Sequence, residues 1–354
     1  MPSRLRVMQA FRAPRSTSNP YIVMLDRTLA STPGMEHLHF DWRRSILGRY
    51  DAIHFHWPEA KLGGSTRLKA FGKQALFAAL LVRLRLSRIA VVRTVHNIEL
   101  PQDISRIERA LIEALDRRTT LRIAINETTP LPPGAPSSTI LHGHYRDWFE
   151  EYPKAAATPG RFGYVGLIRR YKGVEQLVAA YAEAATADPD LSLTVGGKPS
   201  SSELASTIVA LATQTRGAEL RLHFLSDAEL VTIVSEAELI VLPYRFMHNS
   251  GGTLAALSLD RPVLIPRNDA NAALAAEVGP GWVHTYSGEL DADDLRRTII
   301  AVHDDDRSAR PDLSKRDWTD AGIRHRDAFA RAVAIERRRP VHPDAGTTTH
   351  ALED

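Results

Sequence analysis

Short apolar runs alternate with longer amphipathic stretches along most of this 354-residue chain. Such short runs are typical of strands buried on both faces of a parallel sheet, and the amphipathic stretches have helical spacing. The clearest unit spans positions 239–266: an apolar run, a polar loop, a helix start at Asn249 and Ser250, and a second apolar run. Asn and Ser are good helix caps, and Gly251 with Gly252 permits close approach to the backbone. This unit predicts a strand, a loop, a helix and a strand.

The same pattern predicts alternating strands and helices through the rest of the chain. Expected strands are 5–10, 51–56, 89–95, 121–125, 138–141, 162–165, 191–195, 220–224, 239–242, 262–266 and 282–284. Expected helices are 21–29, 67–86, 105–118, 173–185, 202–215, 227–236, 253–259, 270–277, 291–303 and 316–335. Alternation at this spacing indicates βαβ units, so we expect an α/β fold.

The elements fall into two similar halves, which predicts two Rossmann-like doubly wound domains facing each other across a cleft. We expect one domain over 1–150 and a second over 162–315. Positions 151–161 carry Pro, Ala and Gly and predict a linker. A closing helix is expected over 316–336. Positions 337–354 contain few apolar residues and predict a disordered tail.

Charge is distributed unevenly between the halves. Residues 1–150 contain 22 Lys and Arg against 13 Asp and Glu, a net charge of +9, and the remainder carries −6. Between Glu59 and Glu99 there are eight basic residues and no acidic one. This bias predicts an anionic partner, either a membrane surface or a nucleic acid. The chain lacks a nucleic-acid-binding motif, so we expect no nucleic acid. Two alternatives stay open for the basic region: docking on an anionic membrane surface, and a helix with a solvated charged face.

Composition limits the chemistry and the location. The chain has no cysteine, which excludes disulfides, thiolate catalysis and cysteine-ligated zinc. The first residues of the chain form a segment that is too short and too charged for a signal peptide. The apolar run at 75–82 is far shorter than a membrane span. We therefore expect a cytoplasmic protein, with peripheral attachment to the inner face of the membrane as a further expectation.

Ligands in open parallel sheets collect beyond the carboxyl ends of the strands. In the second half, glycines and basic or capping residues follow these strands, a combination that suits a diphosphate. The donor-binding candidates are Gly166, Arg169, Arg170, Lys172, Gly197, Lys198, Tyr244, Asn249, Ser250, Gly251, Gly252 and Thr253. The alternatives are an ordinary βα turn around the glycines and a solvated lysine at position 172.

Histidine and glutamate follow the strands of the first half and could move protons. The candidates are Asn19, His56, Glu59, His96, Glu99, His142 and His144. As alternatives, the loop from His56 to Glu59 could be a rigid strand exit, and His142 and His144 could be polar hinge residues. His54 is expected in the core. We predict no metal site, because His142 and His144 lack a third ligand at matching spacing. Since GxGxxG after the first strand and GxxxxGK[ST] are both absent, NAD and P-loop nucleotides are disfavoured.

Taken together, these motifs resemble GT-B-fold glycosyltransferases with nucleotide-sugar donors, from Leu5 to Phe329. YVGLIRRYKGVEQLVAAY (164–181) is similar to the strand–loop–helix in which a lysine, here Lys172, binds the donor phosphates. ILHGHYRDWF (140–149) is similar to the segment before the interdomain linker. HFHWPE, TVHNIE and NSGGTLAAL resemble bacterial exopolysaccharide glycosyltransferases, including xanthan-type β-mannosyltransferases.

The resemblance implies transfer of a hexose, with mannose from GDP-mannose favoured, to a glycan or lipid-linked saccharide in exopolysaccharide or glycolipid synthesis. It implies that the domain over 1–150 binds the acceptor, that the domain over 162–315 binds the nucleotide sugar, and that the closing helix over 316–336 packs back on the first domain. It implies no cofactor beyond the donor substrate. The alternative is a non-catalytic GT-B-like subunit that binds a glycan or a nucleotide sugar. Retaining members carry an arginine where this chain has Leu167 and glutamates where it has Met247 and Ala255. These departures favour an inverting, metal-independent enzyme with His96 or Glu99 as base, and Glu59 in reserve.

Overall fold

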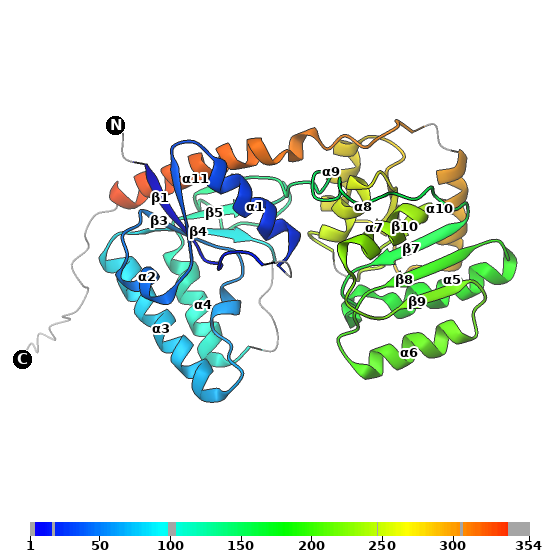
Figure 1. Ribbon diagram of the computed structural model, residues 1–354, viewed down its shortest axis with the longest axis horizontal. Helices are drawn as coiled ribbons and strands as arrows, with labels where there is room; N and C mark the ends of the chain where they lie inside the picture. The colour runs from blue at the N-terminus through cyan, green and yellow to red at the C-terminus, as the bar shows by residue number, and fades with distance from the viewer. Residues whose placement is uncertain (1–3, 16–17, 98–103, 246, 305–306, 339–354) are drawn as a thin grey trace, which may run out of the picture.

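Two lobes, each built on a six-stranded parallel sheet, make up the protein (Figure 1). The computed structural model describes residues 4–15, 18–97, 104–245, 247–304 and 307–338. In the first lobe the strand order is β2-β1-β3-β4-β5-β6. Its strands are β1 (Leu5–Gln9), β2 (Met35–His39), β3 (Ala52–Phe55), β4 (Ala90–Val95), β5 (Leu121–Ala124) and β6 (Ser137–Thr139). Its helices are α1 (Pro20–Ser31), α2 (Trp42–Leu47), α3 (Arg67–Leu86) and α4 (Arg106–Arg118), with a 3-10 turn at Pro58–Lys61.

The second lobe repeats this architecture with the order β12-β11-β10-β7-β8-β9. Its strands are β7 (Arg161–Val165), β8 (Ser192–Gly196), β9 (Ala218–Arg221), β10 (Leu239–Val241), β11 (Val263–Pro266) and β12 (Val283–Tyr286). Its helices are α5 (Val174–Ala187), α6 (Ser202–Thr213), α7 (Asp227–Glu236), α8 (Gly251–Ser258), α9 (Asp269–Val278) and α10 (Ala292–Asp304). The central strands are buried on both faces, as the continuous apolar runs predict.

Alternate residues of the first sheet enter different cores. Val7 of β1 and Val92 of β4 pack into the core shared with α1 and the last helix. Met8 and Val91, one residue away on each strand, pack with α3 and α4 instead. A strand turns successive side chains to opposite faces, so this sheet is covered on both sides. Its carboxyl edge is left for the polar residues that follow the strands.

The last helix, α11 (Trp318–Arg338), follows a 3-10 turn at Ser314–Arg316 and returns to the first lobe. It packs against α1 and β4, and it extends along the top of that lobe in Figure 1. The indole Nε1 of Trp318 donates to the carbonyl of His144 at 2.7 Å. Near its other end, Glu336 pairs with Arg118 at 2.8 Å. A closing helix that packs on the first lobe is therefore present.

The predicted strands and helices are all present, with ends shifted by a few residues, and β2 and α2 were not predicted. Helix α11 continues to Arg338, so the tail predicted from 337 starts too early. Positions 339–354 lie outside the described residues, and the domain boundaries stay predictions. Within the part of the chain that is described, no helix is both long and apolar enough to cross a membrane.

Candidate active site

Two histidines stand where β3 and β4 end at the cleft. His56 follows β3 and His96 follows β4, and His56 Nδ1 lies 2.9 Å from His96 Nε2. The indole of Trp57 stacks on the His96 ring, with centroids 4.1 Å apart and planes inclined by 22°. Tyr21, at the start of α1, packs its edge against His96 and lies 4.5 Å from the ring of His142. The cleft side of the first lobe is thus a cluster of imidazoles held by aromatic rings.

Burial keeps these imidazoles neutral. It lowers the pKa of His56 and His96 well below the usual value of 6.5, and neighbouring positive charge would lower each further. It lowers the pKa of His142 to about 4. A neutral imidazole has a nitrogen lone pair, so His96 can accept a proton from an acceptor hydroxyl.

Other predicted residues of the first lobe are placed as follows. Glu59 is half-buried in the turn after β3, and burial raises the pKa of its carboxyl group. Asn19 is exposed and caps α1, since its side-chain oxygen accepts from the Tyr21 N–H at 2.9 Å. His144 is buried, and its backbone bonds to Arg316 and Trp318. Glu99 lies outside the described residues.

In the second lobe, Lys172 lies over the ring of a buried tyrosine. Its Nζ donates to the Tyr244 hydroxyl at 3.0 Å and is 4.7 Å from the ring centroid. Burial lowers the pKa of Lys172, and the nearby Arg169 charge contributes to that shift. A Cβ on Gly166 would lie 3.5 Å from the Lys172 Nζ. The ammonium group is therefore at the carboxyl end of β7, as the strand–loop–helix pattern predicts.

Close backbone packing explains the glycine at the end of β8. A Cβ on Gly197 would lie 1.8 Å from the carbonyl oxygen of Gly166, and Gly197 has φ +151°. Only glycine fits this position without displacing the neighbouring strand end. The two strand ends therefore meet backbone to backbone beside Lys172, and the exposed Lys198 follows directly.

The start of α8 faces the same tyrosine. Ser250 caps the helix, with its Oγ accepting from the Thr253 N–H at 3.1 Å. The Tyr244 side chain hydrogen-bonds Ser250, and a Cβ on Gly252 would lie 3.5 Å from the Tyr244 hydroxyl. A helix start offers free N–H groups and a partial positive charge, which suit an anionic ligand. Gly251 is exposed there, whereas Thr253 is buried.

Arg169 and Arg170, the two arginines predicted to accompany Lys172, make different contacts. Arg170 pairs with Glu203 of α6 at 2.9 Å, and both side chains are largely exposed. Arg169 is also exposed, and its charge acts on Lys172. Between the two predicted alternatives, the arrangement favours Arg169 as the companion of Lys172.

Asn249 joins the two lobes rather than pointing at Lys172. Its Nδ2 donates to the backbone carbonyl of His96 at 3.1 Å, and its Oδ1 accepts from Asn126 at 2.6 Å. Asn126 also donates to the His248 carbonyl at 3.0 Å, and the Thr129 hydroxyl lies 3.0 Å from His248 Nε2. Asn126 was not among the predicted site residues, although it is a polar residue that directly follows the predicted strand 121–125.

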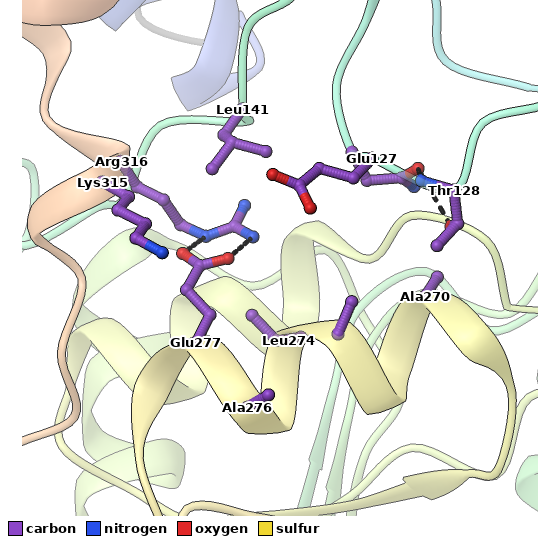
Figure 2. Close-up of a pocket in the computed structure, with 11 residues that line it drawn as sticks. Glu127, Thr128, Leu141, Ala270, Leu274, Ala276, Glu277, Lys315 and Arg316 are labelled. Carbon is purple, nitrogen blue, oxygen red and sulfur yellow. Dashed lines mark hydrogen bonds and ion pairs between the residues drawn. The ribbon is translucent and has the colours of Figure 1, made fainter.

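A cavity of about 270 Å³ opens between the lobes beside this bridge (Figure 2). Arg316 and Glu127 extend into it from opposite sides, and Arg316 pairs with Glu277 of α9 through two contacts of 2.7 Å. A smaller cavity of about 40 Å³ is lined by residues of both lobes, among them His142, Asn249 and Ser250. His142 of the imidazole cluster and Ser250 at the start of α8 thus border a common interlobe space.

Comparison with known proteins found no matching protein-family model. Two curated proteins of Xanthomonas campestris pv. campestris are each 41% identical over 330 residues, 93% of this chain and 93% of their own length. Both are named GDP-mannose:glycolipid 4-beta-D-mannosyltransferase.

Solved structures share the fold at low identity. HepE of Anabaena, bound to UDP and glucose, is 14% identical with a TM-score of 0.57, covering 94% of this chain and 97% of that one. MnaA of S. aureus, bound to UDP, is 13% identical with a TM-score of 0.58 and covers 95% and 99%. Sucrose-phosphate synthase from Thermosynechococcus elongatus is 14% identical with a TM-score of 0.58 and covers 94% and 97%. At these identities the likeness concerns the fold alone, and it confirms the predicted GT-B architecture.

Proposed function

This chain belongs to the glycosyltransferase family of the two Xanthomonas campestris proteins, and we propose that it transfers mannose from GDP-mannose to a glycolipid acceptor. It is therefore an enzyme, as predicted, rather than the non-catalytic subunit kept as the alternative. One observation carries the proposal: Asn249, next to the start of α8, bonds to the backbone of His96. This contact joins the residue before the α8 helix start to the strand end that carries the His96 imidazole.

The donor diphosphate binds at the Lys172 ammonium, with Arg169 and the free N–H groups at the start of α8. Charge-assisted hydrogen bonds of this kind are about twice as strong as neutral ones. As the bond to the sugar breaks, negative charge grows on the leaving diphosphate, and these groups are already oriented toward it. They could fill the role that a divalent cation has in other transferases, so we keep the metal-independent assignment.

On the acceptor side, His96 or Glu99 removes the proton from the attacking hydroxyl group. The oxygen forms a bond to C1 of mannose while the bond between C1 and the diphosphate oxygen breaks, releasing GDP. A single displacement inverts the anomeric centre, so an α-linked donor gives a β-linked product. This outcome agrees with the 4-beta linkage in the names of the relatives. Helix start, lysine and base then act in one step.

Calorimetric titration with GDP-mannose, GDP, UDP-glucose and UDP-N-acetylglucosamine tests the donor. We expect GDP-mannose and GDP to bind and to raise the melting temperature, because a ligand that binds the native state stabilises it. Product analysis with a lipid-linked saccharide should then show a β-linked mannose. Binding of UDP-sugars alone would overturn the donor assignment, and an α-linked product would overturn inversion.

Helix α3 presents a second apolar face, on the side opposite its buried one. Phe77, Leu80 and Leu84 are fully buried. The exposed fractions of the residues on the other side are 80% for Leu68, 65% for Phe71, 58% for Val82 and 78% for Leu86. Exposed Ala75 and Ala79 continue this stripe at helical spacing. A contiguous exposed apolar stripe marks an interaction site.

We assign this stripe to the lipid surface that holds the acceptor. On a helical wheel, Arg67 and Arg85 flank the stripe on one side, and each basic residue near an anionic surface contributes about 1 kcal/mol. Helix α3 lies on the outside of the first lobe, away from the second lobe (Figure 1). Docking there would leave the cleft accessible and hold the enzyme where a lipid-linked acceptor resides.

Co-sedimentation with phosphatidylglycerol and phosphatidylcholine vesicles, at low and high salt, tests the docking. We expect recovery with the anionic vesicles and loss of binding in the double variant Leu68→Ser, Phe71→Ser. The control is Val209→Ser, which removes an exposed apolar side chain from α6 of the other lobe. Equal recovery of the wild-type protein in the supernatant under all four conditions would reject the membrane partner.

A further inference from the structure

Three side chains of the first lobe converge at a point that the proposed reaction does not use. His37 and His39 lie on the edge strand β2, and Asp26 lies on α1, which packs against that strand. Their ligand atoms all lie within 4.8 Å of one another, and no other such group occurs among the residues that the structure describes. We propose that Asp26, His37 and His39 bind one Zn²⁺ ion that clips α1 to the edge of the sheet.

The geometry supports a shared ligand. His37 Nε2 and His39 Nε2 lie 2.6 and 2.7 Å from the same oxygen, Asp26 Oδ1. A four-coordinate zinc ion with bonds of about 2.1 Å separates its ligand atoms by about 3.4 Å. Each imidazole therefore needs to move by about 0.7 Å to admit the ion. Water would take the remaining position.

The chemistry of the three groups suits zinc. Imidazole nitrogen and carboxylate oxygen are common zinc ligands, and the histidines must be neutral to bind. The Nδ1 atom of His37 has no hydrogen-bond partner among the described residues, so the ring proton that Nε2 donates to Asp26 can move to Nδ1 when the ion binds at Nε2.

Burial is graded across the group in a way that permits entry of an ion. The exposed fraction of the side chain is 5% for His37, 17% for Asp26 and 35% for His39. The ring of Phe11 lies 6.4 and 6.5 Å from those of the two histidines and covers one side of the group. His39 therefore faces solvent, while the other two ligands are held in place by the lobe.

Such a clip would act on the cleft through α1. The same helix begins with Tyr21, which packs against His96 and His142. β2 is an edge strand, held by hydrogen bonds to β1 alone within the described sheet. A zinc ion shared by Asp26 and the two histidines would fix α1 against this weakly held strand. It would thereby hold the first turn of α1 in place.

The test measures zinc in protein made without a histidine tag, stripped with a chelator, and dialysed against ZnCl₂. We expect about one equivalent per chain in the wild-type protein and a rise in melting temperature on addition of Zn²⁺. His39→Ala and Asp26→Asn should each lower the affinity more than tenfold and abolish the rise. The control variant is His223→Ala. It should keep the zinc affinity and the rise in melting temperature, because His223 is exposed and pairs with Glu229 in the other lobe.

Each outcome decides the proposal. His39 is half exposed and Asp26→Asn preserves shape, so at least one of these variants should remain folded by circular dichroism. The clip is supported if the wild-type protein binds one equivalent of zinc per chain and a folded variant does not. A wild-type protein without bound zinc overturns it and leaves a carboxylate that accepts two N–H hydrogen bonds. Zinc retained at wild-type affinity in both variants also overturns it and places the ion elsewhere.

Discussion

The two lobes present opposite kinds of surface to the cleft. On the first, His56, His96 and His142 stand among aromatic rings, and the available chemistry belongs to side chains. On the second, Gly166, Gly197 and the start of α8 place backbone around a single lysine. One surface suits proton transfer and the other suits a phosphate. The same doubly wound fold therefore carries either chemistry, and the residues after its strands decide which.

The largest expected effect is on the side-chain surface. His96→Ala or Glu99→Gln, whichever removes the true base, should lower turnover by about 10²–10⁴ while donor affinity stays unchanged. Single-turnover transfer and calorimetric titration with GDP-mannose separate the two quantities. His223→Ala serves as the control, because this histidine lies on the outside of the other lobe. If both variants retain wild-type turnover, the first lobe does not supply the base.

Acid should loosen the first lobe before the second. Burial lowers the pKa of His142 and of His325 from 6.5 to about 4, so between these values the unfolded chain binds more protons than the folded one. The contribution of these two histidines to the free energy of unfolding is fully present above pH 6.5, and it is lost as the pH drops toward 4. At pH 5 each histidine should cost about 2 kcal/mol of unfolding free energy.

Urea denaturation at pH 7 and pH 5 measures this loss, and hydrogen exchange locates it. In His325→Leu, part of the pH dependence should disappear, since the ring nitrogen that titrates is gone. The substitution removes the hydrogen bond from His325 Nδ1 to the Ala321 carbonyl at 2.7 Å, whereas Nε2 has no hydrogen-bond partner among the described residues. Equal protection of both lobes at pH 5 would contradict the comparison.

On the backbone surface, a single methyl group should be enough to destabilise the fold measurably. Gly197→Ala places a Cβ 1.8 Å from the Gly166 carbonyl oxygen, and we expect destabilisation of about 2–3 kcal/mol. Gly288→Ala is the matched control. Gly288 also has positive φ, at +79°, but no atom lies within 4 Å of its Cβ position. Equal melting temperatures for the two variants would show that backbone strain, and not close approach, dominates.

The smallest expected effect concerns donor binding. Lys172→Ala removes one charge-assisted contact of about 1.5–3 kcal/mol, so the affinity for GDP should fall roughly ten- to a hundredfold. Arg170→Ala is the control, because its side chain pairs with Glu203 on the exposed surface and should leave affinity nearly unchanged. Titration of the folded variants with GDP gives both constants. A larger loss in Arg170→Ala than in Lys172→Ala would reverse the assignment.

Local pattern was sufficient for most of the fold and for less of the site. Strands buried on both faces and long amphipathic helices such as α3 have clear periodicity. In contrast, β2 (MEHLH) carries three polar residues on a sheet edge, and α2 has only six residues, so neither gives a strong pattern. Lys172 and Tyr244 lie 72 positions apart, and Asn126 and Asn249 lie 123 apart. Such pairings depend on the order of the strands and on how the lobes dock. Local hydrophobic periodicity does not reveal either of these.

The return of α11 to the first lobe has a consequence for synthesis on the ribosome. Phe329 and Ala332 of this helix belong to the core that Val7 and Val92 enter from the sheet. The first lobe therefore emerges early but cannot complete that core until residues 318–338 have left the exit tunnel. Meanwhile the second lobe, whose strands and covering helices are contiguous in the chain, can fold on its own. The lobe that is translated first should thus be the last to reach its native packing.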